Sequence, residues 1–266
     1  MILSRRVSLD GVELDSLDER IMISLVDDQP PEESRNAANV YAGDGIGSRQ
    51  TARHISSKKV IVKFRLRINK REYETRVKLL ERINAWAKSG GEMRSSTRPD
   101  RMIRVRCTQR AAFGDPREWT KEYQLTFEAN EKPYWEHEQP NTAVSANTSN
   151  VTLDLQADGE LDTVLNAEAL NASGAEISTV TLTSGGRKIK LTGLGLAAQE
   201  ALVIDHTDMN VLRIRIRNAA GNYRSVLGKR TEDSADEILL SPGNNSVKCE
   251  ASRACRFSLS CTGRFC

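Results

Sequence analysis

Three histidines, at positions 54, 137 and 206, are the residues best suited to acid–base or metal chemistry, and they lie in three separate segments. None stands in a ligand spacing such as H-E-x-x-H. The most suggestive group is residues 205–208 (Asp-His-Thr-Asp), because a histidine between two carboxylates can bind a metal or act as a base. The same group follows the apolar residues 202–204, where a polar turn is expected. A turn is the simpler interpretation, and a site is the alternative.

Nucleophilic catalysis finds no support in the sequence. There is no G-x-S-x-G elbow, phosphate-binding G-x-x-x-x-G-K-[ST] loop or catalytic-cysteine signature. The paired carboxylates of a glycosidase meet only in the fold, so the sequence leaves them open. We assign no catalytic, metal-binding or cofactor-binding residue and expect no cofactor. The sequence predicts a protein that is not an enzyme.

Five cysteines are present, an odd number that rules out complete internal pairing. Four of them crowd the end of the chain, and their spacings differ from the C-x₂-C pairs of zinc sites. We expect small buried hydrophobic side chains in strands, with a metal site or a late disulfide as the alternatives. The four are Cys249, Cys255, Cys261 and Cys266.

Basic residues in alternating positions are the most informative chemistry. Five of them belong to two predicted strands and would share the outer face of one sheet: Lys63, Arg65, Arg67, Arg104 and Arg106. Adjacent like charges are unfavourable unless an opposing surface compensates, and Glu122 and Glu128 of a third strand supply part of that. The face is either solvated and ion-paired or a protein–protein interface. Residues 212–217 repeat the pattern, with a solvated face as the default.

Composition describes an ordinary globular protein. The chain has 266 residues, 38% of them hydrophobic and 28% charged, which predicts two domains that fold without disulfides or metals. A net charge of +3 is too small to indicate an anionic membrane, and no aromatic side chains are interleaved with the arginines as in nucleic-acid readers. No run approaches the ~20 apolar residues of a spanning helix. Acidic residues at 10, 13 and 15 replace the apolar core of a secretory signal, so synthesis and folding in the cytosol are expected.

The first half predicts a sheet with one packed helix. Residues 59–69 alternate apolar and mostly basic side chains, which is typical of a strand with one buried face. Residues 72–89 carry an apolar stripe at helical spacing and end at Gly90-Gly91, so they predict an amphipathic helix lying on the sheet. Further strands are expected at 21–25, 101–107 and 121–129.

A long polar stretch, residues 27–59, precedes this helix. It is too long for an ordinary connection and contains Pro30-Pro31 and a glycine cluster at 43–47. The glycine cluster is not a dinucleotide fingerprint, because no clear strand precedes it and no helix follows. We interpret residues 27–59 as an extended loop or arm.

The second half predicts a β-sandwich. Residues 139–150 are rich in Asn, Thr, Ser and Ala and are interpreted as a linker. Short strands separated by turn residues follow without an amphipathic helix between them. They are expected at 151–155, 177–183, 188–191, 202–204, 211–217, 247–251 and 256–261. The predicted fold class is therefore mainly β (β-rich α+β), with domains at 1–138 and 151–266.

This layout resembles the distal tail proteins of siphophages, the Dit family. The resemblance rests on the strand 60–68, the helix 72–89 with Gly90-Gly91, the segment 98–107, and residues 123–129 leading into Lys-Pro-Tyr-Trp-Glu at 132–136. In the second half it rests on Pro-Gly-Asn-Asn at 242–245, the hairpin to position 255, Phe-Ser-Leu at 257–259, and Gly-Arg-Phe at 263–265.

The resemblance implies a structural virion protein at the tip of a non-contractile phage tail, assembled in the bacterial cytoplasm. The first domain, sandwich-like with one helix and an arm, would form a hexameric ring that joins the tail tube protein to the tail tip hub protein. The second would be a galectin-like or carbohydrate-module-like sandwich that meets receptor-binding proteins. The alternative is a carbohydrate-binding or other adhesion module without a ring-forming role. No membrane or sequence-specific nucleic acid is expected as a partner.

Overall fold

The computed structural model divides the chain into two compact units. Unit 1 comprises Met1–Trp135 with Cys266, and unit 2 comprises Glu136–Phe265. Among the described residues, no helix is long and apolar enough to span a membrane. The structure describes residues 5–30, 32–39, 48–69, 71–113, 122–207 and 211–266.

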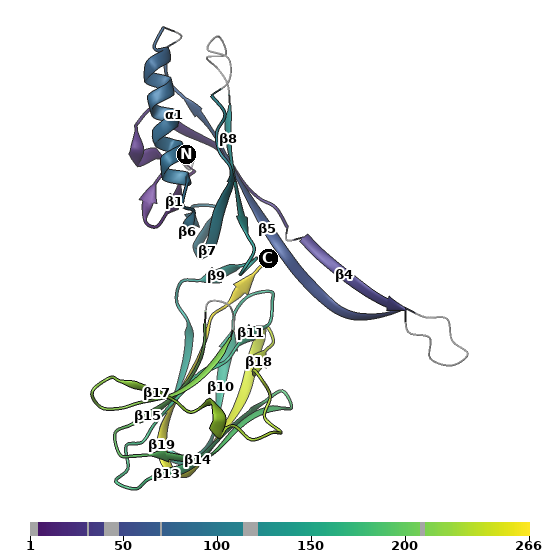
Figure 1. Cartoon of the computed structure of the whole chain (residues 1–266), viewed down its shortest axis with the longest axis vertical. Coiled ribbons are helices and arrows are strands. Elements are labelled where there is room, and N and C mark those ends of the chain that lie inside the picture. The colour runs from purple at the N-terminus through teal and green to yellow at the C-terminus, as the bar shows by residue number, and fades with distance from the viewer. Residues whose placement is uncertain (1–4, 31, 40–47, 70, 114–121, 208–210) are drawn as a thin grey trace. The chain divides into compact units, whose positions relative to one another are not determined.

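Unit 1 is a twisted antiparallel sheet with one helix (Figure 1). Its strands are β1 (Val7–Leu9), β2 (Val12–Glu13), β3 (Ile21–Asp28), β4 (Glu32–Asn39), β5 (Ser48–Leu66), β6 (Gly91–Ser95), β7 (Arg98–Gln109) and β8 (Tyr123–Ala129). The spatial order is β2-β1-β6-β7-β8-β5-β3, and β4 pairs with β5. A short 3₁₀ turn, Asp15–Leu17, links β2 to β3.

The helix α1 (Tyr73–Ala87) covers the inner face of this sheet. Leu80 and Ile83 are buried on its apolar stripe, and the Trp86 ring meets the edge of Phe127 at 6.3 Å. The alternating residues of β5 and β8 supply the sheet side of this core, where Phe64 stacks on Tyr123 at 5.5 Å. The predicted helix and its packing on the sheet are confirmed.

The predicted arm contains two strands. β3 pairs with β5 from Ile21↔Leu66 to Asp28↔Val60, and β4 continues the same side of β5 from Glu32↔Ser57 to Asn39↔Ser48. β8 pairs with β5 only between Lys58 and Phe64. Within the described residues, the first part of β5 therefore pairs with β4 alone, and the two strands form a ribbon beyond the sheet (Figure 1).

Unit 2 is built around two long strands that change direction. Its elements are β9 (Trp135–His137, which begins in unit 1), β10 (Asn141–Ala157), β11 (Thr163–Val164), β12 (Asn166–Leu170), β13 (Ile177–Ser184), β14 (Arg187–Leu196), β15 (Ala201–His206), β16 (Leu212–Arg217), β17 (Tyr223–Ser225), a 3₁₀ turn (Leu227–Lys229), β18 (Leu239–Leu240), β19 (Gly243–Cys261) and β20 (Arg264–Phe265).

The strands β10 and β19 pair along their whole lengths and belong to both layers of a sandwich. The start of β19 also pairs with β13, and its end pairs with β12. Register shifts interrupt the β10–β19 pairing between Val144 and Asn150. The amide of Asn141 at one end of β10 donates to the carbonyl of Gln156 near the other end at 2.8 Å. The strand pair therefore folds over, as strands do when irregularities bend them across a sandwich corner.

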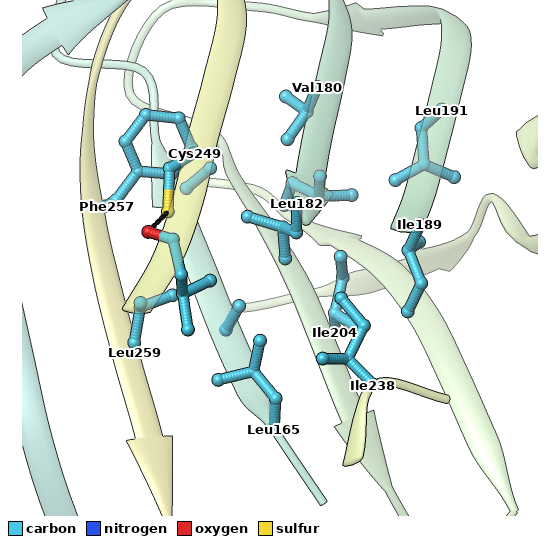
Figure 2. Close-up of a cluster of buried hydrophobic side chains, with 14 of the residues drawn as sticks. Leu165, Val180, Leu182, Ile189, Leu191, Ile204, Ile238, Cys249, Phe257 and Leu259 are labelled. Atoms are coloured by element: carbon cyan, nitrogen blue, oxygen red, sulfur yellow. Dashed lines mark hydrogen bonds between the residues drawn. The ribbon is translucent and has the colours of Figure 1, made fainter. Parts of the chain in front are cut away.

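The core between the two layers is apolar and includes cysteines. Figure 2 shows Cys249 beside Phe257 and close to Leu259, with its thiol directed at the carbonyl of Val247, 3.9 Å away. Cys249, Cys255 and Cys261 are free and fully buried. The expectation of small buried side chains in a strand is confirmed for these three.

The structure corrects three expectations. The predicted linker 139–150 lies largely within β10, because its small polar residues alternate in register with β19. The polar arm is not a loop but a strand pair, since main-chain pairing needs no apolar pattern. The two strands expected at 247–251 and 256–261 are parts of the single strand β19. The turn cluster at 43–47 and Asp208 lie outside the described residues.

Candidate assembly surface

The outer face of the unit 1 sheet, opposite α1, carries all five predicted basic residues. Pairing registers place their neighbours: Met22 lies opposite Arg65, and Lys63 lies between Leu25 and Gln124. Near the other end of the sheet, Arg106 lies opposite Glu128, which in turn lies opposite Lys59. The residues therefore share one face but occupy two separate regions of it.

Arg104 and Arg106 lie among carboxylates. Arg104 is opposite Glu92 on β6, and Arg106 donates to Glu131 at 3.0 Å in addition to facing Glu128. Both arginines are exposed. Exposed ion pairs of this kind contribute little stability, typically about 0 to 1 kcal/mol, but they neutralise the surface. This region matches the solvated, ion-paired interpretation.

Lys63 and Arg65 of β5, and Arg67 directly after its end, follow one another at alternate positions with much less compensation. Arg65 approaches Glu122 at 3.5 Å, and Arg67 donates to the sulfur of Met22. Neither Lys63 nor Arg67 has a carboxylate partner among the described residues. We call Lys63, Arg65 and Arg67 the open basic patch.

The open basic patch also exposes apolar surface. Met22 is 41% exposed beside Arg65, and Leu25 is half-buried beside Lys63. The three cations are spaced by about 7 Å along the strand, so they repel one another in the isolated chain. A surface that combines apolar area with positive charge largely uncompensated by the described residues fits a protein contact with an acidic surface better than it fits bulk water.

The strand β16 in unit 2 has the same alternating arginines but balances them internally. Asp205 accepts hydrogen bonds from Arg213 at 3.0 and 2.9 Å and from Arg215 at 2.7 Å. Arg217 pairs with Glu168 at 2.7 Å. This face is therefore a self-contained network.

Asp205 and His206 are the last two residues of β15, and Thr207 follows them. Two arginines form ion pairs with the carboxylate of Asp205, and Nδ1 of His206 lies 3.2 Å from the amide oxygen of Asn166. Burial lowers the pKa of His206 below its ordinary value. The residues that the structure describes include no cluster of three His, Cys, Asp or Glu side chains able to hold a metal. The geometry gives Asp205 and His206 a structural role within the fold, but in a strand rather than in the predicted turn.

The buried thiols are poor nucleophiles. Burial raises the pKa of Cys249 to about 12 and that of Cys255 and Cys261 to about 11. Because the thiolate is the reactive form, these cysteines are almost entirely in the inert thiol form near neutral pH. Burial also raises the pKa of Cys107, which is only partly buried.

A buried ionic cluster, which sequence reasoning missed, lies where β5 leaves the sheet. Lys58 is 1% exposed, and its Nζ lies 2.8 Å from both Oδ1 of Asp28 and the carbonyl of Gln29. Arg98 of β7 pairs with the other oxygen of Asp28, and its guanidinium lies 5.8 Å from the ring centre of the buried Trp135. The sequence contained only a weak indication of this cluster. Two acidic residues stand shortly before Pro30-Pro31, and Lys58 occupies the same alternate positions as the buried residues of β5.

One solved structure has a similar fold along the whole chain. The SPP1 Dit (gp 19.1) protein, described as a paradigm of the hub adsorption apparatus in phages that infect Gram-positive hosts, matches with a TM-score of 0.70 and 16% identity, over 98% of this chain and 99% of that chain. A chain of the phage p2 baseplate in its activated conformation matches with a TM-score of 0.48 and 10% identity, over 97% of each chain. No protein-family model and no curated protein matches.

Sixteen per cent identity is low, so the comparison with SPP1 Dit concerns the fold. It covers both units, including the strand–helix–strand–strand order of unit 1 and the sandwich of unit 2. The mainly β fold class is confirmed. This chain has the fold of a phage Dit hub protein from end to end, and the resemblance seen in its sequence is confirmed at the level of the fold.

Proposed function

We propose that the protein is a structural subunit of a phage tail hub, one that assembles with copies of itself into a hexameric ring at the end of a non-contractile tail. Its site of action would be the virion tail tip, reached after assembly in the host cytoplasm. Its partners would be the tail tube protein, the tail tip hub protein and receptor-binding proteins. The observation that carries the proposal is the fold shared with SPP1 Dit over 98% of the chain.

The arm supports a role in assembly. A two-stranded ribbon is at best marginally stable by itself in water. Within the described residues, β4 and the first part of β5 pair only with each other. Contact with a neighbouring subunit would supply the additional pairing or burial that such a ribbon needs.

The open basic patch is a second observation that supports a role in assembly. A ring closes through heterologous contacts, in which one surface of a subunit meets a different surface of the next. Lys63 and Arg67 lack carboxylate partners among the described residues, and Met22 beside them is exposed. The patch is the part of the outer face at which a second subunit would replace mutual repulsion by attraction.

We propose a structural rather than a catalytic role. The carboxylate of Asp205 next to His206 is held by arginines, and the thiols of β19 are buried with raised pKa values. Asp205 and these thiols are thus used within the fold. A screen for hydrolase activity on intact protein is expected to be negative.

Glycan binding by unit 2 is less well supported. Glycan sites use exposed aromatic platforms, and Phe257 and Phe265 are buried. Tyr223 is 49% exposed, but the guanidinium of Arg215 lies over its ring at 4.4 Å. One face of the ring is therefore occupied, and a glycan array with the full chain is expected to be blank.

Light scattering and negative-stain microscopy of the purified chain test the proposal. We expect a concentration-dependent assembly with sixfold rings. A chain that stays monomeric at high concentration and does not bind tail tube protein would contradict it.

A further inference from the structure

We propose that Lys58 is a positioning residue: its buried ammonium group, tied to Asp28 and through it to Arg98, fixes the arm to the body of unit 1. This inference rests on the proposed assembly function, because it concerns how the arm is presented to a neighbour. It assigns a role to a buried charge that neither the fold nor the open basic patch explains.

The position of Lys58 is the first argument. β4 pairs with β5 as far as Ser57, and β8 begins to pair with β5 at Lys58. Lys58 is therefore the residue at which β5 passes from the arm ribbon into the sheet. A constraint here acts at the root of the arm.

A break in the main-chain pairing is the second argument. Between β3 and β4 the chain runs through Pro30-Pro31, and prolines have no N–H to donate to β5. Just before them, the N–H of Gln29 donates to the carbonyl of Lys59 at 3.1 Å. The ammonium of Lys58 adds two further contacts at this level, to the Asp28 carboxylate and to the Gln29 carbonyl, both at 2.8 Å.

The energetic cost of the arrangement is the third argument. Burying an ammonium group is unfavourable unless it is paired and hydrogen-bonded, and apolar residues of similar volume often give equal or greater stability. The advantage of this ionic cluster is that it joins particular groups: Lys58 donates to the Gln29 carbonyl and pairs with Asp28, which also pairs with Arg98. Through Arg98, whose guanidinium lies over the Trp135 ring, the cluster joins the arm root to β7 and to Trp135 as well.

Lys58→Met tests the role, because it keeps an unbranched apolar stem of similar length and leaves Asp28 paired with Arg98. In dilute, unassembled protein, we expect hydrogen exchange of the arm amides (32–39 and 48–57) to rise about tenfold, while α1 and residues 60–66 keep wild-type protection. The concentration at half-assembly is expected to rise about tenfold, which is 1.4 kcal/mol. Lys59→Met, one residue away on the outer face, is the matched control and should change either value less than about twofold.

Two results would overturn the proposal: wild-type exchange and assembly in Lys58→Met, or an equal rise in exchange throughout unit 1, which would show a general stabilising role. If Lys58→Met does not fold, Asp28→Asn removes the same ion pair while keeping its volume, and the same exchange pattern is expected. If the wild-type chain does not assemble, the proposed function fails, whereas the exchange pattern still decides whether Lys58 anchors the arm.

Discussion

The strands β5 and β16 carry nearly the same sequence pattern and use it in opposite ways. In both, arginines or lysines alternate with buried apolar residues. On β16, each arginine has a carboxylate partner: Asp205 of the neighbouring β15 holds Arg213 and Arg215, and Glu168 of β12, two strands away, holds Arg217. On β5, Arg65 has one partner at 3.5 Å, and Lys63 and Arg67 have none among the described residues.

The difference lies in the neighbouring strands. The strand β15 beside β16 carries Asp205 opposite Arg213, and β12, one strand further on, carries Glu168. By contrast, Met22, Leu25 and Gln124 stand beside the basic residues of β5. Basic alternation alone therefore says only that one face is polar. Whether that face is complete in the monomer depends on which strands lie beside it.

Reversing charge on the two strands gives the largest expected contrast. The double variant Lys63→Glu/Arg67→Glu should raise the concentration at half-assembly about 100-fold, near 2.7 kcal/mol, because two attractive contacts become repulsive. Its melting temperature should stay within about 2 °C of wild type, since exposed unpaired charges contribute little to folding. Light scattering and calorimetry measure the two quantities.

The matched control for that variant is Arg213→Glu/Arg215→Glu on β16. It should lower the melting temperature, because both introduced carboxylates face Asp205, and it should leave the assembly of the folded fraction unchanged. Equal loss of assembly in the two double variants would remove the distinction between the faces.

Removing the carboxylate of Asp205 on β15, which Arg213 and Arg215 of β16 share, tests the self-contained network. Asp205→Ala should lower the free energy of unfolding by about 1 to 2 kcal/mol, because two half-buried arginines lose their hydrogen-bond acceptor. Glu122→Ala beside β5 should cost less than about 0.5 kcal/mol, since its pair with Arg65 is long and exposed. Urea titrations measure both, and a larger loss for Glu122→Ala would reverse our ranking of the two faces.

Raising the salt concentration should weaken assembly through the open basic patch, with a smaller effect than the charge reversals. Raising ionic strength from about 0.1 to 1 M shortens the Debye length from about 10 to 3 Å. Half-assembly is expected to shift about fivefold to higher protein concentration if the open basic patch meets an acidic surface. Assembly that strengthens with salt would indicate an apolar contact around Met22 instead.

The smallest expected effect is on the pH dependence of folding stability, through His206 next to Asp205. Burial holds the pKa of His206 below its ordinary value, so the unfolded chain binds the proton more readily. Its contribution to stability is complete above about pH 7.5 and is lost as pH falls through 6.5 toward the lower pKa of the folded state. His206→Gln should flatten this part of the stability profile, measured by urea titration at pH 7.5 and pH 5.5. A profile unchanged by the substitution would assign the slope to other groups.

Much of the fold followed from local patterns. The stripe from position 72 to 89 and its glycine stop predicted α1, and alternation predicted the second part of β5, β7, β8 and the longer strands of unit 2. Short strands such as β6, β12 and β18 were missed, because so few residues carry little periodic signal. β10 was interpreted as a linker because Ser, Thr and Asn residues are common in both edge strands and loops.

The sequence predicted which residues make up the candidate surface, but not how those residues divide into two regions. The five basic residues were correctly placed on the outer face, but their division into an ion-paired region and an open basic patch depends on register. Register between strands distant in the chain follows from turns and core packing together, which a single sequence does not display.

What the sequence determined by itself is therefore periodicity: which residues are buried, where the helix begins and ends, and which strand faces are basic. The tertiary structure decided which charges find partners. It placed carboxylates within reach of the arginines of β16, whereas Lys63 and Arg67 have none among the described residues, and it buried Lys58 against Asp28 at the root of the arm. The physical reason is that alternation is a property of one strand, whereas charge compensation is a property of the strands that lie next to it.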